Sequence, residues 1–152
     1  MRTLFILSFS SVLYSTAAFG QTANAAYDSV LAKKLGADEH GMKRYVLAFL
    51  KQGLNTDTSN RKQLIQAHLK NIGRLAKEGK LVVSGPFLDK GTIAGIYVFN
   101  VTTIDEARSL TASDPAVKAG IFDMELHPWY SSAALMEIVP IHNTLQKKSI
   151  TD

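Results

Sequence analysis

Residues 61–86 read RKQLIQAHLKNIGRLAKEGKLVVSGP and contain the change of pattern that decides the fold. Over Arg61 to Lys80 the apolar residues recur at helical spacing, and Gly79 is typical of a helix C-terminus. The apolar face of this helix consists of Leu64, Ile65, Leu69, Ile72, Leu75 and Ala76. The next run, Leu81 to Ser84, is β-prone and closes at Gly85-Pro86. The stretch therefore predicts a helix followed directly by a strand.

The flanking segments extend this unit on both sides. A β-prone run from Tyr45 to Leu50 precedes it, and after a turn at Asp89-Lys90-Gly91 a strand is expected over Ile93 to Val101. A second helix is expected from Thr103 to about Ala112, and a fourth strand over Ile121 to Trp129. The order β-α-β-β-α-β is the ferredoxin-like arrangement. We expect an α+β fold in which two helices cover one face of a four-stranded antiparallel sheet.

The first twenty residues have the form of a signal peptide. Met1-Arg2-Thr3 precedes an apolar stretch from Leu4 to Phe19, and small residues allow cleavage after Gly20 or Ala25. The alternative is an uncleaved membrane anchor, which needs ~20 strongly apolar residues. We expect residues 1–20 to be removed, which predicts a periplasmic or secreted protein without a stable membrane anchor.

The remaining segments frame one domain. Residues 21–41 are rich in alanine, lysine and polar side chains and indicate a loosely held linker with a short helix around Tyr27 to Leu35. The domain itself is expected over 42–136, and 137–152 form a C-terminal tail. In that tail the run Ile138-Val139-Pro140-Ile141 is interpreted as a short extra edge strand.

Composition excludes several classes of function. The chain has 152 residues, of which 46% are hydrophobic, which suits one packed core. Its net charge is only +4 and no basic cluster stands out, so nucleic acid is not an expected partner. There is no cysteine, which excludes disulfides, thiolate metal sites, a cysteine nucleophile and a lipoprotein anchor.

Alternate positions of two predicted strands suggest an association surface. Tyr45, Leu47 and Phe49 are apolar in the first strand, and Gly95, Tyr97 and Phe99 are apolar in the third. The two helices cover only one face of the sheet, so the other face is left without a partner in the chain. An exposed apolar sheet face implies association, and a homodimer that stacks two sheets face to face is the simplest closed solution.

Two residues are the candidates for chemistry. His68 lies one turn from Leu64 and Ile72 on the apolar stripe, so its imidazole is expected to point toward the sheet. There it is either a satisfied core histidine or a proton carrier oriented by a carboxylate. Asp114 precedes Pro115, which holds its backbone extended; the alternative is a turn-forming Asp-Pro.

Further residues are candidates for substrate binding. Ser84, Gly85 and Pro86 end the second strand where backbone can approach a ligand, although a simple strand terminator explains them equally well. His127 and Trp129 flank Pro128 on one side of the last strand, where edge packing or dimer contacts are the alternative. The four histidines lack metal-ligand spacing, and no phosphate-binding glycine loop or serine elbow is present. We therefore expect no metal and no cofactor.

Taken together, these motifs resemble the YciI-related family over roughly Lys43 to Tyr130. The motifs that carry the resemblance are Ala67-His68-Leu69, Glu78-Gly79-Lys80, Ser84-Gly85-Pro86-Phe87, Asp105-Glu106-Ala107, Asp114-Pro115 and Glu125-Leu126-His127-Pro128-Trp129. The resemblance implies a ferredoxin-like fold that dimerises as an α+β barrel, similar to muconolactone isomerase-type proteins. It also implies a catalytic pair at His68 and Asp114. Some relatives act on chlorinated aromatic compounds as dehydrochlorinases.

Two hypotheses of function follow. In the first, His68 is a general acid and base acting on a small cyclic or aromatic molecule, in isomerase, lyase or dehydrochlorinase chemistry, and Asp114 orients the imidazole. In the second, the chain is a noncatalytic periplasmic module for ligand binding or assembly, and His68 satisfies a buried polar position.

Overall fold

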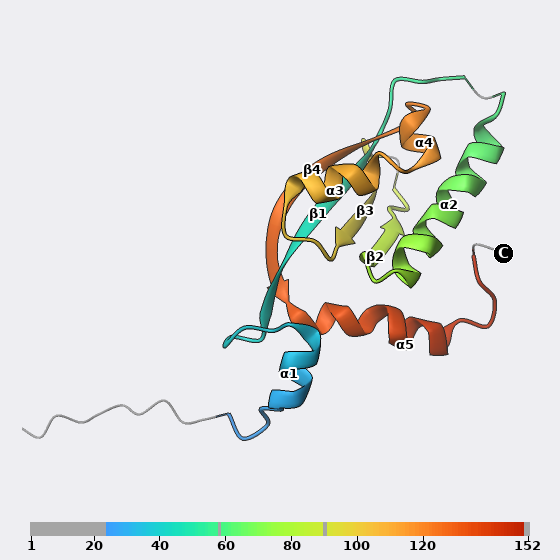
Figure 1. The fold of residues 1–152 in the computed structure, drawn as a ribbon. Coiled ribbons are helices and arrows are strands. Elements are labelled where there is room, and N and C mark those ends of the chain that lie inside the picture. The colour runs from blue at the N-terminus through green and yellow to red at the C-terminus, as the bar shows by residue number, and fades with distance from the viewer. Residues whose placement is uncertain (1–23, 58, 90, 151–152) are drawn as a thin grey trace, which may run out of the picture.

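The sheet of the computed structural model has four antiparallel strands in the order β2-β3-β1-β4 (Figure 1). The strands are β1 (Met42–Gln52), β2 (Leu81–Pro86), β3 (Ile93–Phe99) and β4 (Phe122–Ser132). The structure describes all residues except 1–23, 58, 90 and 151–152. The predicted signal peptide thus lies outside the described residues and stays a prediction. The strand order and the antiparallel pairing confirm the α+β, ferredoxin-like fold.

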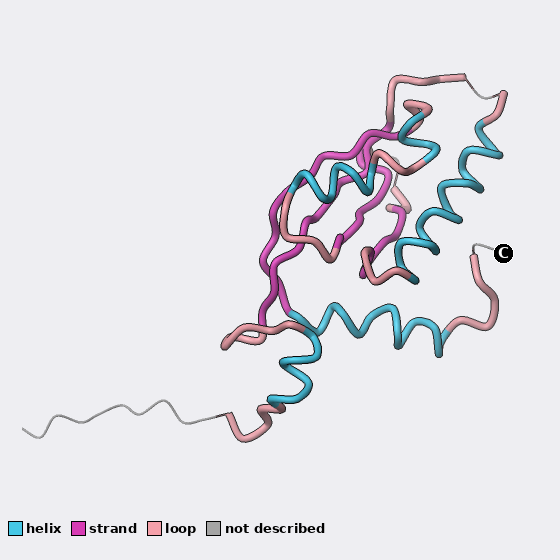
Figure 2. The backbone as a smooth tube through the Cα atoms, viewed as in Figure 1, coloured by secondary structure: helices cyan, strands magenta, loops and turns pink. Residues whose placement is uncertain are grey.

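Helices cover one face of this sheet, as Figure 2 shows. They are α2 (Arg61–Lys77), α3 (Ile104–Thr111) and the short α4 (Pro115–Lys118). Outside the β-α-β-β-α-β unit lie α1 (Ser29–Leu35), the 3-10 helix η1 (Ala133–Glu137) and α5 (Ile138–Leu145). Among the described residues, no helix is long and apolar enough to span a bilayer.

The helix α2 ends at Lys77 with Glu78 as its C-cap, within one residue of the end that Gly79 predicts. Gly79 adopts a left-handed conformation with φ of 68°. Its N–H donates to the carbonyl of Ala76, and the N–H of Lys80 donates to the carbonyl of Leu75. These two bonds form a Schellman motif, which satisfies carbonyls at the end of α2 and directs the chain into β2.

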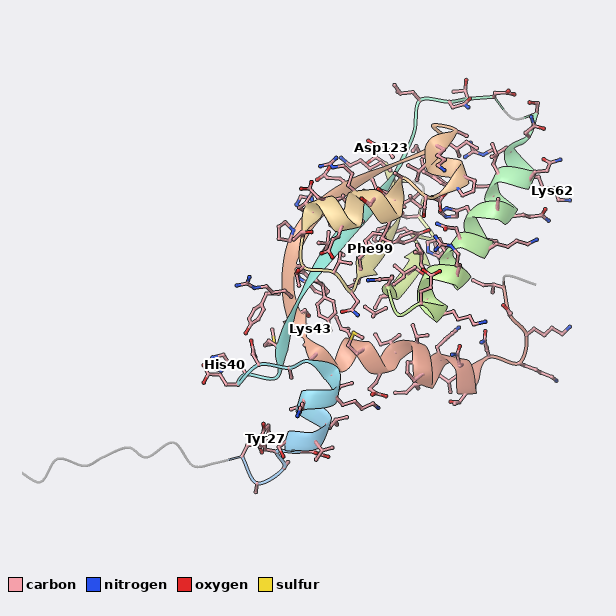
Figure 3. The ribbon with its side chains drawn as sticks, viewed as in Figure 1. Tyr27, His40, Lys43, Lys62, Phe99 and Asp123 are labelled. Atoms are coloured by element: carbon pink, nitrogen blue, oxygen red, sulfur yellow. The ribbon has the colours of Figure 1, made fainter. Side chains whose placement is uncertain are left out.

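The core lies between the sheet and the helices. Val46, Ala48 and Leu50 alternate along β1 and are all buried on the helix side. Figure 3 shows Phe99 between the sheet and the helices, whereas Lys62 points away from the sheet. Two hydrophobic clusters result, one around Phe99 and one around Phe122 further along the sheet.

The opposite sheet face is partly covered, contrary to the expectation that it has no partner within the chain. Tyr45, Val82 and Val98 are buried there beneath Leu135 and Met136 of η1. The remainder of this face carries the half-buried apolar side chains of Leu47, Phe49, Ile96 and Trp129. At one end it carries the polar and charged side chains of Lys51, Glu125 and His127. Of the residues expected on this face, Tyr97 and Phe99 belong to the helix side instead.

The predicted edge strand over Ile138-Val139-Pro140-Ile141 is wrong, because these residues begin α5. Their β-branched side chains favour a strand, but Pro140 has no N–H to give to a sheet. In the first turn of a helix the missing N–H costs nothing, since that position has no intrahelical acceptor. The helix α5 passes under the sheet beside β2 (Figure 1).

The segment expected to be a loosely held linker contains α1, which is tied to the rest of the molecule. One oxygen of Asp28 accepts hydrogen bonds from the N–H groups of Val30 and Leu31 at 2.9 Å, which caps the helix. At the other end Leu35 is buried, and the Lys34 ammonium lies 2.9 Å from the Glu137 carboxylate. The short helix itself falls where the sequence predicts it.

A close approach of β2 and β3 gives a test of this packing. A Cβ on Gly95 would lie 2.5 Å from the carbonyl oxygen of Gly85, whereas a Cβ on Gly85 would meet nothing within 4 Å. We expect Gly95→Ala to lower the free energy of unfolding by about 1–3 kcal/mol, because the backbone of β2 must move. The matched Gly85→Ala change should have little effect in urea denaturation. Equal effects of the two substitutions would contradict the described approach.

Candidate functional site

The structure brings His68 and Asp114 into direct contact. His68 lies on the sheet-facing side of α2, and Asp114 is the N-cap residue of α4. The Nδ1 atom of His68 is 2.9 Å from Oδ2 of Asp114. His68 is 6% exposed and Asp114 is fully buried. The pair is therefore a buried hydrogen-bonded site with a carboxylate, where an incomplete set of partners would be costly.

The Asp114 carboxylate has partners on both oxygens. Oδ1 accepts the N–H groups of Ala116 and Val117 at 2.9 and 3.3 Å, which caps the first turn of α4. Oδ2 accepts from His68 and, at 3.0 Å, from the Asn71 amide. Four donors thus replace the water that the carboxylate loses on burial.

These contacts assign the protonation of the imidazole. An ionised carboxylate can only accept, so Nδ1 of His68 carries a proton toward Asp114. In the neutral ring Nε2 is then an acceptor, and it lies 3.1 Å from the Tyr97 hydroxyl, which donates to it. Tyr97 comes from β3, so the relay Tyr97–His68–Asp114 connects the sheet, α2 and α4.

Burial and charge shift two pKa values in this relay. Burial raises the pKa of the Asp114 carboxyl, but the hydrogen bond and charge of His68, together with the N–H donors, outweigh it, so the net pKa is below the ordinary value. For Tyr97, burial and then the negative charge of Asp114 raise the pKa of the hydroxyl. Asp114 is consequently held as a carboxylate and Tyr97 as a neutral hydroxyl.

A polar network supports the pair from the outer side of α2. Arg74 donates to Oδ1 of Asn71 at 2.7 Å and to the Ser113 hydroxyl at 3.1 Å, and both Glu78 oxygens accept from Arg74. The sequence reasoning missed Asn71 and Tyr97. The spacing of His68, Asn71 and Arg74, three residues apart, is a signal for a polar stripe on one helix face. The strand around Tyr97 is otherwise apolar and gives no such signal.

The other predicted site residues are not gathered at this pair. Ser84 pairs with Tyr97, so the two side chains lie on the same face of the sheet. The Ser84 side chain is nevertheless exposed, because β2 is the edge strand. Gly85 and Pro86 follow it along the same edge strand. His127 and Trp129 lie on the opposite face of the sheet.

On that opposite face the two aromatic residues contact other groups. His127 lies 2.8 Å from a Glu125 oxygen and packs edge-on against the Phe49 ring. Trp129 packs against Tyr45, with ring centroids 6.2 Å apart. The sheet separates both residues from His68, so within one chain they do not line a common site with it.

Metal ligands do not converge anywhere in the part of the chain that the structure describes, since no three His, Asp or Glu side chains there could hold an ion. Every buried side-chain nitrogen or oxygen of the described residues has a hydrogen-bond partner. What the site offers chemically is one imidazole held between a carboxylate and a hydroxyl.

A ferredoxin-like sheet with a His–Asp pair buried under its helices defines a small α+β domain. The profile of the YCII-related domain matches residues 44–130, which is more than half of the chain. The chain belongs to the YCII-related domain family. The resemblance noted from the sequence motifs is thereby confirmed.

The chain is similar to two proteins in particular. The uncharacterized protein YjpA of Bacillus subtilis is 27% identical over 81 residues, covering 53% of this chain and 92% of that protein. Among solved structures, 5-chloro-2-hydroxyhydroquinone dehydrochlorinase (TftG) from Burkholderia phenoliruptrix, in complex with 2,5-dihydroxybenzoquinone, matches with a TM-score of 0.44 and 23% identity. That match covers 55% of this chain and 92% of the other.

The pair makes stability depend on pH in a defined direction. A carboxyl whose pKa is lower in the folded than in the unfolded chain stabilises the fold at pH values above its unfolded pKa of about 3.9. This stabilisation is lost as the pH falls through the pKa of the folded state. We expect Asp114→Asn to cost about 2 kcal/mol at neutral pH, because a donor replaces an acceptor opposite His68 and Asn71.

Urea denaturation of both proteins between pH 7 and pH 2.5 measures this difference. The gap between wild type and Asp114→Asn should narrow below pH ~4, as the wild-type carboxylate is protonated. Asp123→Asn, at an exposed position on β4, is the matched control and should behave as wild type. A gap that stays constant down to pH 2.5 would show that the Asp114 charge does not contribute.

Proposed function

We propose that the chain is a small-molecule enzyme in which His68 is the general acid and base and Asp114 orients it. The observation that carries this proposal is the 2.9 Å contact between Nδ1 of His68 and the Asp114 carboxylate. With Nδ1 protonated, Nε2 has the free lone pair and is the reactive atom. A carboxylate at Nδ1 fixes the tautomer and stabilises the imidazolium that forms when Nε2 takes a proton.

The chemistry that suits one such base is proton abstraction from carbon. Nε2 takes the proton, and the electron pair of the C–H bond forms a new carbon–carbon double bond. In an isomerase the existing double bond of the substrate breaks as the new one forms, and its electron pair takes the proton from Nε2 at another carbon of the same molecule. In a dehydrochlorinase the neighbouring carbon loses chloride, and His68 releases its proton to water. Both outcomes use the same residues, with His68 as the base and Asp114 as the group that orients it.

Access to Nε2 requires a movement of the site. The Tyr97 hydroxyl occupies the acceptor position at 3.1 Å, and His68 is 6% exposed. The His68 imidazole lies between the two hydrophobic clusters. Tyr97 belongs to one of them, and Phe122, whose ring centroid is 5.1 Å from that of the imidazole, belongs to the other. A substrate that separates these clusters and displaces the Tyr97 hydroxyl reaches the base.

A second candidate function is a noncatalytic module for ligand binding or assembly. The observation that favours it is the complete use of both Asp114 oxygens by protein groups, one of them for capping α4. In that case His68 serves the fold alone, and its replacement changes stability without removing a turnover.

Turnover by a His68→Gln variant separates the two functions. The purified protein is assayed for chloride release and double-bond movement against chlorinated hydroxyaromatic compounds and unsaturated cyclic lactones. We expect the variant to lose at least about 100-fold in kcat while remaining folded, because a glutamine cannot carry the proton. His40→Gln, at an exposed position before β1, is the control and should keep full activity. Full turnover by folded His68→Gln, or no turnover of any compound by wild type, would contradict the enzyme proposal.

We also propose that two chains associate through the sheet face opposite α2 and α3, over the apolar part that η1 does not cover. Leu47 and Phe49 are half-buried there, beside the ion-paired Lys51 and Glu125. Light scattering of the purified protein should therefore give the mass of a dimer. Leu47→Lys should yield monomers, because it places a charge in the contact, whereas Leu54→Lys changes a fully exposed leucine and should not. A monomeric wild type, or a dimeric Leu47→Lys variant, would exclude this interface.

A further inference from the structure

A pocket of about 570 Å³ lies between α2, β2 and α5, away from the His68 site. Figure 1 shows α5 running beneath the lower end of α2 and β2. Its walls are mainly apolar, and Ile72, Ala76, Leu81 and Val139 are among the residues that form them. His68, Tyr97 and Asp114 do not line it, so its occupant would not contact the proposed base.

One side of the pocket is built by a segment beyond the matched family domain. Val139, His142, Asn143 and Gln146 line it, and all follow residue 130, where the family match ends. The helix α5 has no buried residue of its own, although its composition is strongly apolar. The extension therefore adds a wall to an existing face of the domain rather than a second core.

Among the described residues that line the pocket, the one charged side chain is the Lys77 ammonium group, and none is Asp or Glu. The neighbouring Glu78 is bound through both oxygens by Arg74, and Lys77 has no ion pair among the described residues. From α5, His142 and the amide of Asn143 add hydrogen-bond donors, since the Asn143 oxygen already accepts from Gln146.

We propose that this pocket binds an apolar small molecule that carries one anionic group, of the kind represented by a medium-chain carboxylate. Its volume lies in the range of about 300–1,000 Å³ that is usual for small-molecule sites. The apolar walls would take the hydrocarbon body. Lys77, His142 and Asn143 would donate to the anion.

Fluorescence titration with 8-anilinonaphthalene-1-sulfonate, an apolar probe with one sulfonate, tests the proposal on the purified protein. We expect one site per chain, from which decanoate displaces the probe and decyltrimethylammonium does not. Lys77→Glu should weaken probe binding about tenfold, because attraction becomes repulsion. Lys70→Glu makes the same charge change on α2 outside the pocket and should leave the affinity unchanged.

A second pair of variants tests the apolar part of the site independently of charge. Val139→Phe places a ring in the pocket and should weaken probe binding about tenfold. Its circular dichroism spectrum and its unfolding midpoint should match those of wild type, which shows that the variant is folded. Ile141→Phe lies on the same helix at an exposed position outside the pocket and is the control.

Three results would overturn the proposal. They are no saturable binding, equal weakening by each variant and its control, and equal displacement by the anionic and cationic competitors. Binding that appears only together with a change of mass in light scattering would assign the pocket to a second copy of the chain, which also excludes it. None of these results bears on His68, since turnover is not measured.

Discussion

The buried carboxylate of Asp114 is the group on which the arrangement of the helices depends. It accepts from α2 through His68 and Asn71, and from the first turn of α4 through two backbone N–H groups. A helix of four residues such as α4 has no stability of its own, so the cap holds it in place. The cap in turn fixes the position at which the carboxylate meets the imidazole.

This constraint links stability to the proposed chemistry. A buried carboxylate contributes little to stability unless it is fully hydrogen-bonded, and the partners of Asp114 and His68 come from three elements of the fold, α2, α4 and β3. Around the pair, the two hydrophobic clusters supply the burial that strengthens its electrostatics. A completed network makes the imidazole rigid, and a rigid base with one defined lone pair is what proton transfer from carbon requires.

Much of the fold could be predicted from local pattern. The alternation along Tyr45 to Leu50 and the helical spacing around His68 are strong signals, because one face of each element is buried. Asp114 could be proposed from Asp-Pro geometry, but its contact with His68 depends on how α4 packs against α2. Tyr97 could not be singled out, since its neighbours in β3 are apolar and only the strand register places its hydroxyl at Nε2.

The tail shows the limit of the same reasoning. Ile138 and Val139 favour a strand by propensity, yet they belong to the helix α5, which lies against β2. That outcome depends on tertiary contacts, as does the pocket beneath α5. Residues that lie in such contacts, including Lys77 and His142, have no sequence pattern that marks them as neighbours.

The proton position on His68 tests the central claim most directly. Nitrogen-15 NMR of the imidazole in the wild-type protein at pH 8 distinguishes a protonated from an unprotonated ring nitrogen. The expected result is a neutral ring with its proton on Nδ1 toward Asp114 and a bare Nε2 facing the Tyr97 hydroxyl. A proton on Nε2 would contradict it, because the ring would then have no lone pair at the position where the proposed base must act.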